Sequence, residues 1–362
     1  MPLRPGVHCR RTRHGRPERS DVDMTHRRSI GRWTGWVTAA LVLVVLAATP
    51  SAAAPAAGPA PGGDRTGSYS SSEGRLAYQV HVPPSWRPDR PMPVVVAVHG
   101  CAMSGYGLNS MKATTRFDDL ADREGFLVVY PTQSLLRNVQ MCWNSLSPDH
   151  QDRGRGEPEL LAGMIRQVVG EYGADARQVH VAGASSGAGT AVILGVTYPD
   201  LVATVTSVAG GEYGFHRAQD DLDAVTPVDN ARLARSVMGT RARHVPLLVV
   251  QGDQDEVVPP FMADRLVQQW LALDALIDTG LPDADPAPDD VTRVAPPGGH
   301  PYTLTSHRGP GGAAIDSYLV EGQGHAWSGP RADGLFVDRA GPDLSEIVWD
   351  FAAGRPMSTE GS

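Results

Sequence analysis

Short, almost continuously apolar runs alternate along this chain with longer segments in which apolar and polar positions follow a helical period. Apolar runs of this kind predict buried strands, and the longer periodic segments predict helices. The predicted strands are residues 93–98, 126–130, 179–182, 202–208, 245–251 and 314–320. The predicted helices are residues 111–124, 158–173, 188–198, 231–238, 261–276 and 344–351. This alternation predicts a single α/β domain with a doubly wound, mostly parallel sheet that is covered by helices on both faces.

A Gly-Ala-Ser-Ser-Gly sequence at 183–187 lies between the predicted strand 179–182 and the predicted helix that follows it. The G-x-S-x-G pattern in this context is typical of a nucleophile elbow, in which a serine occupies a sharp strand-to-helix turn. Glycines flank such a serine because a Cβ atom there would collide with the neighbouring strand and helix. Ser185 is therefore the candidate nucleophile. Taken alone, the pentapeptide also fits a flexible Gly/Ser loop.

A serine hydroxyl needs a base and an acid that orients the base, and candidates for both follow later strands. Asp253, Asp255 and Glu256 share the turn after strand 245–251, and either aspartate could orient a histidine. His325 follows strand 314–320 and is the candidate general base. The chain order Ser, Asp, His, with each residue just past a strand, is typical of α/β-hydrolases.

Strand 93–98 ends in His99-Gly100-Cys101, where this fold places the first donor of an oxyanion hole. The backbone N–H groups of Cys101 and of Ser186, the residue after the nucleophile, are the expected pair of donors. We interpret His99 as a structural residue that is hydrogen-bonded beneath this loop.

The chain resembles the esterase family of extracellular poly(3-hydroxybutyrate) depolymerases, which includes feruloyl and acetylxylan esterases. The resemblance covers residues 69–353 and rests on five segments: His99-Gly100-Cys101, Cys142-Trp143, the elbow around Ser185, residues 252–258, and Gly-His-Ala-Trp-Ser-Gly at 324–329. It implies serine esterase chemistry, secretion, a Cys101–Cys142 disulfide, and Asp255 rather than Asp253 as the triad acid. The chain departs from the family at Ala188-Gly189, where a second glycine or a methionine is common, and this affects the expected shape of the acyl pocket.

The first 53 residues have the features of a secretory signal: a basic start, a short apolar segment and small residues before the expected cleavage site after Ala53. Met24 would begin a signal of ordinary length, and an uncleaved membrane anchor is the alternative. We expect residues 54–68 to be a disordered lead-in, residues 69–356 to form the catalytic domain and residues 357–362 to be a tail. Residues 278–312 are rich in Pro, Gly and Asp and are expected as a loop insertion, either overhanging the site or serving as a variable linker.

The formal net charge of the chain is −8. Residues 1–53 carry nine Arg and three acidic residues, so removing them changes the charge to −14. This balance argues against nucleic acid and anionic membranes as partners. Cys9 would leave with the signal, and Cys101 and Cys142 remain as a pair in an oxidising compartment, with two free thiols as the alternative. The histidine and acidic spacings fit no metal site, and the mechanism needs no cofactor.

The sequence therefore predicts a secreted serine esterase, most similar to poly(3-hydroxybutyrate) depolymerases, that acts on a polyester or a small ester. A feruloyl or acetylxylan esterase that acts on soluble or polysaccharide-linked esters is the alternative, and a non-catalytic secreted binding protein is the alternative of another class. Because the sequence ends at Ser362, soon after the last predicted helix, we expect crystalline polymer to be the less favoured substrate. Trp327 and Trp143 are expected either to line the substrate pocket or to pack beside the His325 loop and the disulfide.

Overall fold

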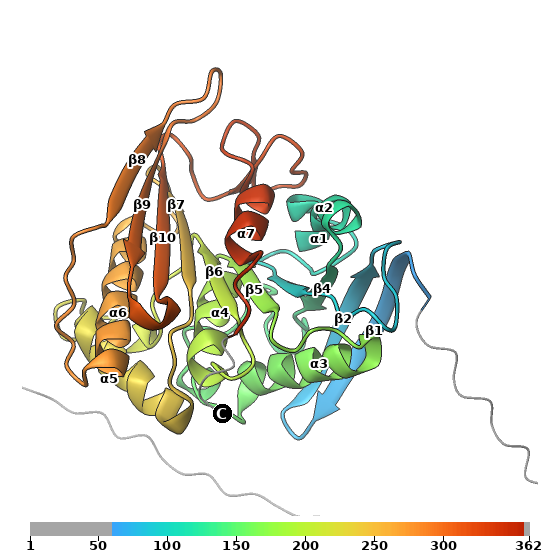
Figure 1. Cartoon of the computed structure of the whole chain (residues 1–362), viewed down its shortest axis with the longest axis horizontal. Coiled ribbons are helices and arrows are strands. Elements are labelled where there is room, and N and C mark those ends of the chain that lie inside the picture. The colour runs from blue at the N-terminus through green and yellow to red at the C-terminus, as the bar shows by residue number, and fades with distance from the viewer. Residues whose placement is uncertain (1–59, 358–362) are drawn as a thin grey trace, which may run out of the picture. The chain divides into compact units, whose positions relative to one another are not determined.

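Six parallel strands form the centre of a ten-stranded sheet in the computed structural model, which describes residues 60–357. Their order across the sheet is β4 (Leu127–Thr132), β3 (Val94–Val98), β5 (Val179–Ala184), β6 (Thr204–Val208), β7 (Leu247–Gly252) and β10 (Ala314–Val320). Antiparallel hairpins extend both edges: β1 (Gly63–Ser71) with β2 (Gly74–Val82), and β9 (Tyr302–Arg308) with β8 (Asp290–Val294). Figure 1 shows this sheet with helices in front of it and behind it.

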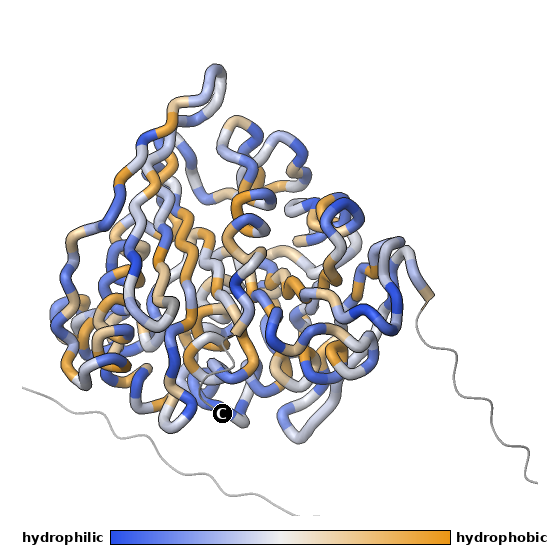
Figure 2. Tube along the Cα trace, in the orientation of Figure 1, coloured by the Kyte–Doolittle hydropathy of each residue, from blue (hydrophilic) through white to orange (hydrophobic). Residues whose placement is uncertain are grey.

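The central strands are mostly buried because both of their faces are covered, and most of their residues are apolar, although β6 and β10 also contain buried polar residues such as Thr204 and Asp316. In β3, Val94, Val96 and Val98 belong to one core cluster and Val95 and Ala97 to another, as the two-residue period of a strand requires. The first cluster includes buried side chains of four helices, α3 (Gly156–Tyr172), α4 (Ser186–Thr197), α5 (Pro227–Met238) and α6 (Phe261–Asp278). The second contains α1 (Met111–Thr115), α2 (Phe117–Glu124) and α7 (Leu344–Ala352). Figure 2 shows the resulting concentration of hydrophobic residues along the central strands.

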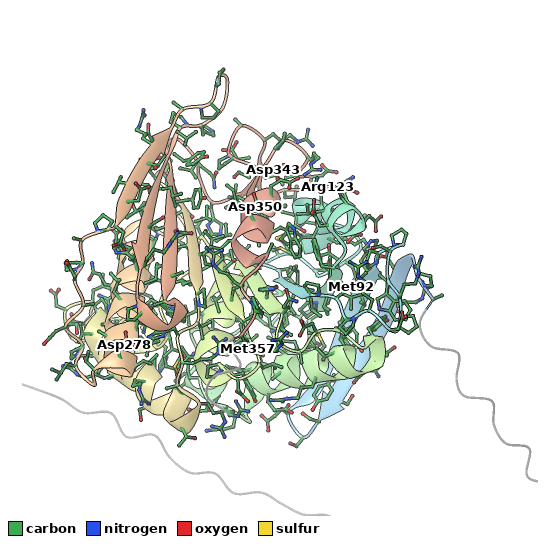
Figure 3. All side chains as sticks on the ribbon, viewed as in Figure 1. Met92, Arg123, Asp278, Asp343, Asp350 and Met357 are labelled. Carbon is green, nitrogen blue, oxygen red and sulfur yellow. A yellow bond between two sulfur atoms is a disulfide. The ribbon has the colours of Figure 1, made fainter. Side chains whose placement is uncertain are left out.

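The predicted fold class, a doubly wound and mostly parallel α/β sheet, is confirmed, and the described residues belong to one compact unit. The predicted helix 111–124 is divided into α1 and α2, because Arg116 has a left-handed backbone with φ of 54°. Near the end of the chain, β11 (Trp327–Ser328) and β12 (Val337–Asp338) form a small second sheet. Helix α7 lies beside α2, where Arg123 forms two hydrogen bonds with Glu346. Figure 3 labels Arg123 in α2 and Asp350 in α7.

Two expectations about the segments at the edges of the sheet need correction. Residues 63–68, expected within a disordered lead-in, form most of β1, so the domain begins before residue 69. This strand is polar because it is an edge strand, and its backbone pairs with β2 along its whole length. The segment 278–312, expected as a loop, contributes β8 and β9 to the opposite edge. The hairpin lacks a strong apolar pattern because β8 is mostly exposed.

The expected signal, residues 1–53, and the tail beyond Met357 lie outside the described residues. Within residues 60–357, no helix combines the length and the apolar composition that a membrane crossing requires.

Candidate active site

Ser185 occupies the sharp turn between β5 and α4. Its backbone angles, φ 55° and ψ −121°, lie outside the regions that a serine usually adopts. Such a conformation costs about 1–3 kcal/mol and persists only where the surrounding structure enforces it. Here the Ser185 N–H donates a hydrogen bond of 2.9 Å to the carbonyl oxygen of Val208, which anchors the turn to the neighbouring strand β6.

The two glycines of the pattern have the steric role that the sequence predicts. A Cβ atom at Gly183 would lie 2.1 Å from the carbonyl oxygen of Gly187. A Cβ atom at Gly187 would lie 2.3 Å from the carbonyl oxygen of Val98. Both distances are far shorter than van der Waals contact, so the elbow can pack against β3 and α4 only with glycine at these positions.

His325 and Asp255 form a hydrogen-bonded pair at the carboxyl ends of β10 and β7. The His325 Nδ1 atom lies 2.8 Å from Asp255 Oδ2, and the Asp255 side chain is fully buried. The backbone N–H groups of Val257 and Val258 donate to Asp255 Oδ1 at 2.9 and 2.8 Å. These bonds fix the carboxylate in the orientation that contacts the histidine.

Asp253, the other candidate for the acid of the triad, has a different hydrogen-bond partner. The Asp253 Oδ1 atom accepts a hydrogen bond of 2.7 Å from the backbone N–H of Gly322, in the turn that precedes His325. The structure therefore brings Asp255, and not Asp253, into contact with the histidine. Asp253 instead joins the two loops that carry Asp255 and His325.

Ser185 and His325 line the same cavity of about 250 Å³. Within residues 60–357, the structure contains no hydrogen bond between the Ser185 hydroxyl and the His325 ring. Catalytic hydrogen bonds are often long or poorly aligned in the absence of substrate and shorten when it binds. The arrangement therefore places base and nucleophile at one cavity without fixing their final distance.

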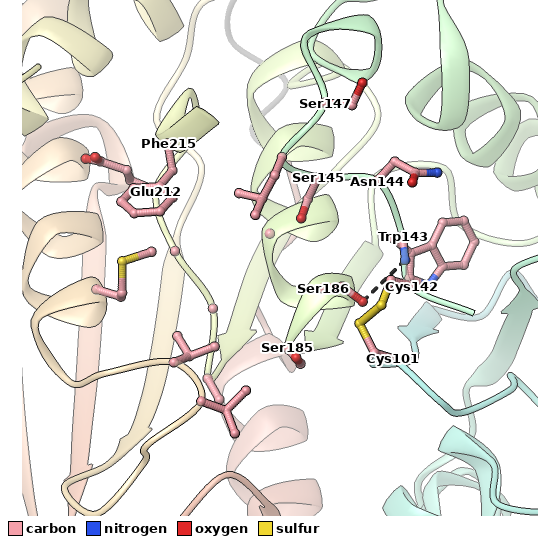
Figure 4. Close-up of a pocket in the computed structure, with 18 of the residues that line it drawn as sticks. Cys101, Cys142, Trp143, Asn144, Ser145, Ser147, Ser185, Ser186, Glu212 and Phe215 are labelled. Atoms are coloured by element: carbon pink, nitrogen blue, oxygen red, sulfur yellow. Dashed lines mark hydrogen bonds between the residues drawn. A yellow bond between two sulfur atoms is a disulfide. The ribbon is translucent and has the colours of Figure 1, made fainter. Parts of the chain in front are cut away.

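The backbone N–H groups of Cys101 and Ser186 donate to no acceptor in the described part of the chain. Cys101 and Ser186 both line a larger cavity at Ser185. The Cys101–Cys142 disulfide connects the loop after β3 to this region. The backbone N–H of Trp143 in turn donates to Ser186 Oγ at 3.3 Å, and Figure 4 shows this bond beside the disulfide. Two free amide donors at the mouth of an elbow can stabilise an oxyanion.

His99 is fully buried beneath this loop, and burial lowers its pKa to about 4. Its Nδ1 atom contacts the carbonyl oxygen of Gly100 at 2.7 Å, and the backbone N–H of Gln133 donates to its Nε2 atom at 3.0 Å. A neutral imidazole with both nitrogens engaged orders the turn at Gly100, next to the Cys101 amide.

Two cavities meet at Ser185. The larger, about 590 Å³, is lined by residues that include Ser145, Leu146, Phe215, Val257 and Met262. The smaller contains His325, Trp327 and Phe336. Sequence reasoning identified His325 and Trp327, but it missed the other lining residues, most of which lie in loops where no periodic pattern marks them. The segment 278–312 contributes no residue to the lining of either cavity.

The two tryptophans have different surroundings. Trp327 lines the smaller cavity and packs edge-on against Phe117, with ring centroids 5.8 Å apart. Trp143 belongs to the wall of the larger cavity, but in Figure 4 its indole ring points away from Ser185. The ring packs against His99, with ring centroids 5.4 Å apart. Trp143 therefore supports the wall, whereas Trp327 faces the space beside the histidine.

One cluster outside this site has the donor atoms of a metal centre. Oxygen atoms of Asp64 and Asp118 and a ring nitrogen of His81 lie within 4.8 Å of one another. The Lys112 ammonium lies 2.6 Å from both carboxylates and compensates their charge. The protein's own cation thus pairs with both carboxylates that a metal ion would need as ligands.

This chain is similar to known esterases and depolymerases in sequence and to a known esterase in fold. The family model described as esterase PHB depolymerase matches residues 76–292. The poly(3-hydroxyalkanoate) depolymerase C of Paucimonas lemoignei is 27% identical over 71% of this chain and 60% of its own length. The acetylxylan esterase A of Aspergillus awamori is 32% identical over 49% of this chain and 61% of its own length.

The chain thus spans about 60% of the length of these curated relatives. Among solved structures, an acetyl xylan esterase from Aspergillus awamori matches with a TM-score of 0.57 and 22% identity, covering 72% of this chain and 94% of that one. That likeness shows the fold. The family match covers more than half of the residues of this chain and shows that the chain belongs to the esterase PHB depolymerase family.

Proposed function

We propose that this protein is a serine esterase that hydrolyses carboxylic esters through an acyl-enzyme. The observation that carries the proposal is the fixed Asp255–His325 pair at a cavity shared with Ser185, whose strained turn exposes the hydroxyl. Family membership supports the same chemistry.

In this mechanism His325 takes the proton of the Ser185 hydroxyl as the oxygen attacks the ester carbonyl. Asp255 orients the imidazole and stabilises the imidazolium that forms. The N–H groups of Cys101 and Ser186 donate hydrogen bonds to the oxyanion of the tetrahedral intermediate. His325 then protonates the departing alcohol, and a water molecule activated by the same histidine releases the acid from Ser185.

Replacing Ser185 by alanine tests the proposal directly. We expect Ser185→Ala to fold normally and to lower kcat for p-nitrophenyl butyrate by several orders of magnitude. A fluorophosphonate probe should label the wild type and not the variant. An active variant would contradict the proposal, and failure of the wild type to react with probe and ester would favour a non-catalytic binding protein.

For the substrate, we propose a hydroxyalkanoate polyester. The matching family is described as a PHB depolymerase family, and a relative that aligns with 71% of this chain is a poly(3-hydroxyalkanoate) depolymerase. The acetylxylan and feruloyl esterase relatives favour a second candidate, soluble or polysaccharide-linked acetyl or feruloyl esters. Turbidity of an amorphous poly(3-hydroxybutyrate) suspension distinguishes the two. Clearing by the wild type and not by Ser185→Ala supports the polyester, whereas hydrolysis of p-nitrophenyl butyrate without clearing supports the small esters.

We also propose that the protein is exported and that residues 1–53 are removed on export. The basic and apolar pattern of this segment and the Cys101–Cys142 disulfide support the proposal, because structural disulfides persist in oxidising compartments. Mass spectrometry of protein recovered from the culture medium should give a mature chain that begins at Ala54. Protein that stays with the cell membrane at full length would favour an uncleaved anchor.

A further inference from the structure

The two cavities at Ser185 are not equivalent, because His325 lines the smaller and not the larger. In the proposed mechanism, on which this inference rests, His325 must protonate the departing alcohol oxygen. The alcohol therefore leaves on the side of the histidine, and the acyl chain extends to the opposite side of Ser185. This places the acyl group in the cavity of about 590 Å³.

One wall of this cavity is a rigid loop, residues 142–147, held from behind by Glu157. Glu157 is 1% exposed and accepts hydrogen bonds from the Asn144 backbone N–H at 2.8 Å and from the Asn144 side chain at 2.6 Å. The side chain of Gln151 donates to the carbonyl oxygen of Ser145 at 2.7 Å. These bonds hold the backbone on both sides of Ser145 and therefore fix the backbone position from which its side chain extends.

Ser145 directs its hydroxyl into the cavity, as Figure 4 shows. Within the described residues this hydroxyl has no hydrogen-bond partner, whereas much of the surrounding lining is apolar, including Leu146, Phe215 and Met262. A hydroxyl can both donate and accept a hydrogen bond. Polar residues such as Gln140 and Glu212 also line the cavity. The free Ser145 hydroxyl, beside these apolar side chains, favours a ligand that carries an oxygen or nitrogen atom opposite it.

Gly189, one turn after the nucleophile, makes room for this side chain. A Cβ atom at position 189 would lie 2.9 Å from Ser145 Oγ and 3.0 Å from Ser145 Cβ. The absence of a side chain at Gly189 lets the Ser145 side chain approach α4 next to Ser185 and Ser186.

We propose that Ser145, in the space left by Gly189, is a specificity-determining residue whose hydroxyl binds an oxygen atom on the acyl chain. The substrates so favoured are esters of hydroxylated acids, including acids whose hydroxyl is itself esterified. Acyl groups without such an oxygen fit the same cavity but leave the Ser145 hydroxyl without a partner from the substrate.

The experiment compares p-nitrophenyl 3-hydroxybutyrate with p-nitrophenyl butyrate, which differ by one oxygen on the acyl chain. In Ser145→Ala, the ratio of the two kcat/KM values should fall about tenfold, with little change for the butyrate. Gly189→Ala should lower the same ratio, since the added methyl group displaces Ser145. The control is Ser236→Ala, which removes an exposed hydroxyl on α5 that lines neither cavity and should leave the ratio unchanged.

A second pair of esters tests whether the larger cavity holds the acyl group rather than the alcohol. For ethyl butyrate and 2-hydroxyethyl butyrate, which differ on the alcohol, Ser145→Ala should leave the ratio unchanged. A fall in this ratio, or an unchanged ratio for the acyl pair, would overturn the proposal. Labelling of Ser185 by a fluorophosphonate in every variant separates these outcomes from failure of the esterase function itself, in which no ester would be hydrolysed and no label would appear.

Discussion

The turn at Ser185 holds a serine in a conformation with φ of 55°, and its stability depends on the absence of side chains at two neighbouring positions. The strain cannot relax, because Gly183 and Gly187 lie in direct contact with backbone atoms rather than with movable side chains. Backbone atoms of a central strand and of a buried helix have little freedom to shift. The exposed nucleophile is thus a consequence of packing at residue scale.

A pair of alanine substitutions measures this constraint. Gly187→Ala should lower the free energy of unfolding by at least about 2 kcal/mol, since the new Cβ would overlap the carbonyl oxygen of Val98. Gly170→Ala is the matched control, because Gly170 lies in helix α3 with open space around the added atom. It should stabilise by about 0.5–1 kcal/mol. Urea denaturation measures both, and equal effects would show that the elbow tolerates a side chain.

The two aspartates of the β7 turn give a second prediction at this scale. Asp255→Asn should lower kcat by about three to four orders of magnitude, because an amide at this position no longer stabilises the imidazolium of His325. Asp253→Asn keeps an oxygen for the Gly322 N–H and should keep kcat within about threefold of the wild type. Steady-state kinetics with p-nitrophenyl butyrate compares them. A larger loss in Asp253→Asn than in Asp255→Asn would reverse the assignment.

At the scale of elements, the Cys101–Cys142 disulfide connects the end of β3 to the wall of the larger cavity. Replacing both cysteines by serine should lower the free energy of unfolding by about 2–4 kcal/mol, since the bridge closes a long loop. It should also lower kcat, because Cys101 carries a proposed oxyanion donor. Thermal unfolding and p-nitrophenyl butyrate kinetics measure the two effects. Lower stability with unchanged kcat would limit the disulfide to a structural role.

The sequence predicts best those strands that are buried on both faces of the sheet, because burial on both faces gives them a recognisable run of apolar residues. Strand β3 is apolar at every position and β7 from Leu247 to Val250. The candidate residues Ser185, Asp255 and His325 follow buried strands in chain order. Edge strands carry a weaker signal, since β1 and β8 are exposed along most of their length and obtain their order from backbone pairing. The lining of the cavities depends on which loops meet in space, and a single sequence does not contain that information.

At the scale of the whole molecule, one partly buried charge cluster joins the β1–β2 hairpin to the helices α1 and α2. The His81 ring contacts Asp64 at 3.0 Å and Asp122 at 2.9 Å, and Asp118 lies 3.4 Å away. Lys112 bridges Asp64 and Asp118. Because hairpin and helices meet the central sheet at β4, this cluster couples the edge of the sheet to its core. Its ionisation should therefore affect the stability of the entire domain.

Burial of the His81 ring opposes its protonation, but hydrogen bonds with Asp122 and Asp64 and the charge of Asp118 outweigh burial and raise its pKa above 6.5. A histidine with a raised pKa in the folded state contributes stability that is complete below the unfolded value, near 6.5. That contribution disappears as the pH rises through the folded value. The difference in unfolding free energy between wild type and His81→Gln should therefore be largest near about pH 6 and should decrease toward about pH 9.

Urea denaturation at several pH values measures this difference directly. Comparing the two proteins at each pH cancels the contributions of His99 and His180, whose pKa values burial lowers to about 4 and which oppose stability on the acid side. A difference that stays constant with pH would mean that His81 contributes through packing and neutral hydrogen bonds. A difference that grows as the pH rises would mean that the ring is neutral in the folded protein, and that Lys112 alone compensates the three carboxylates.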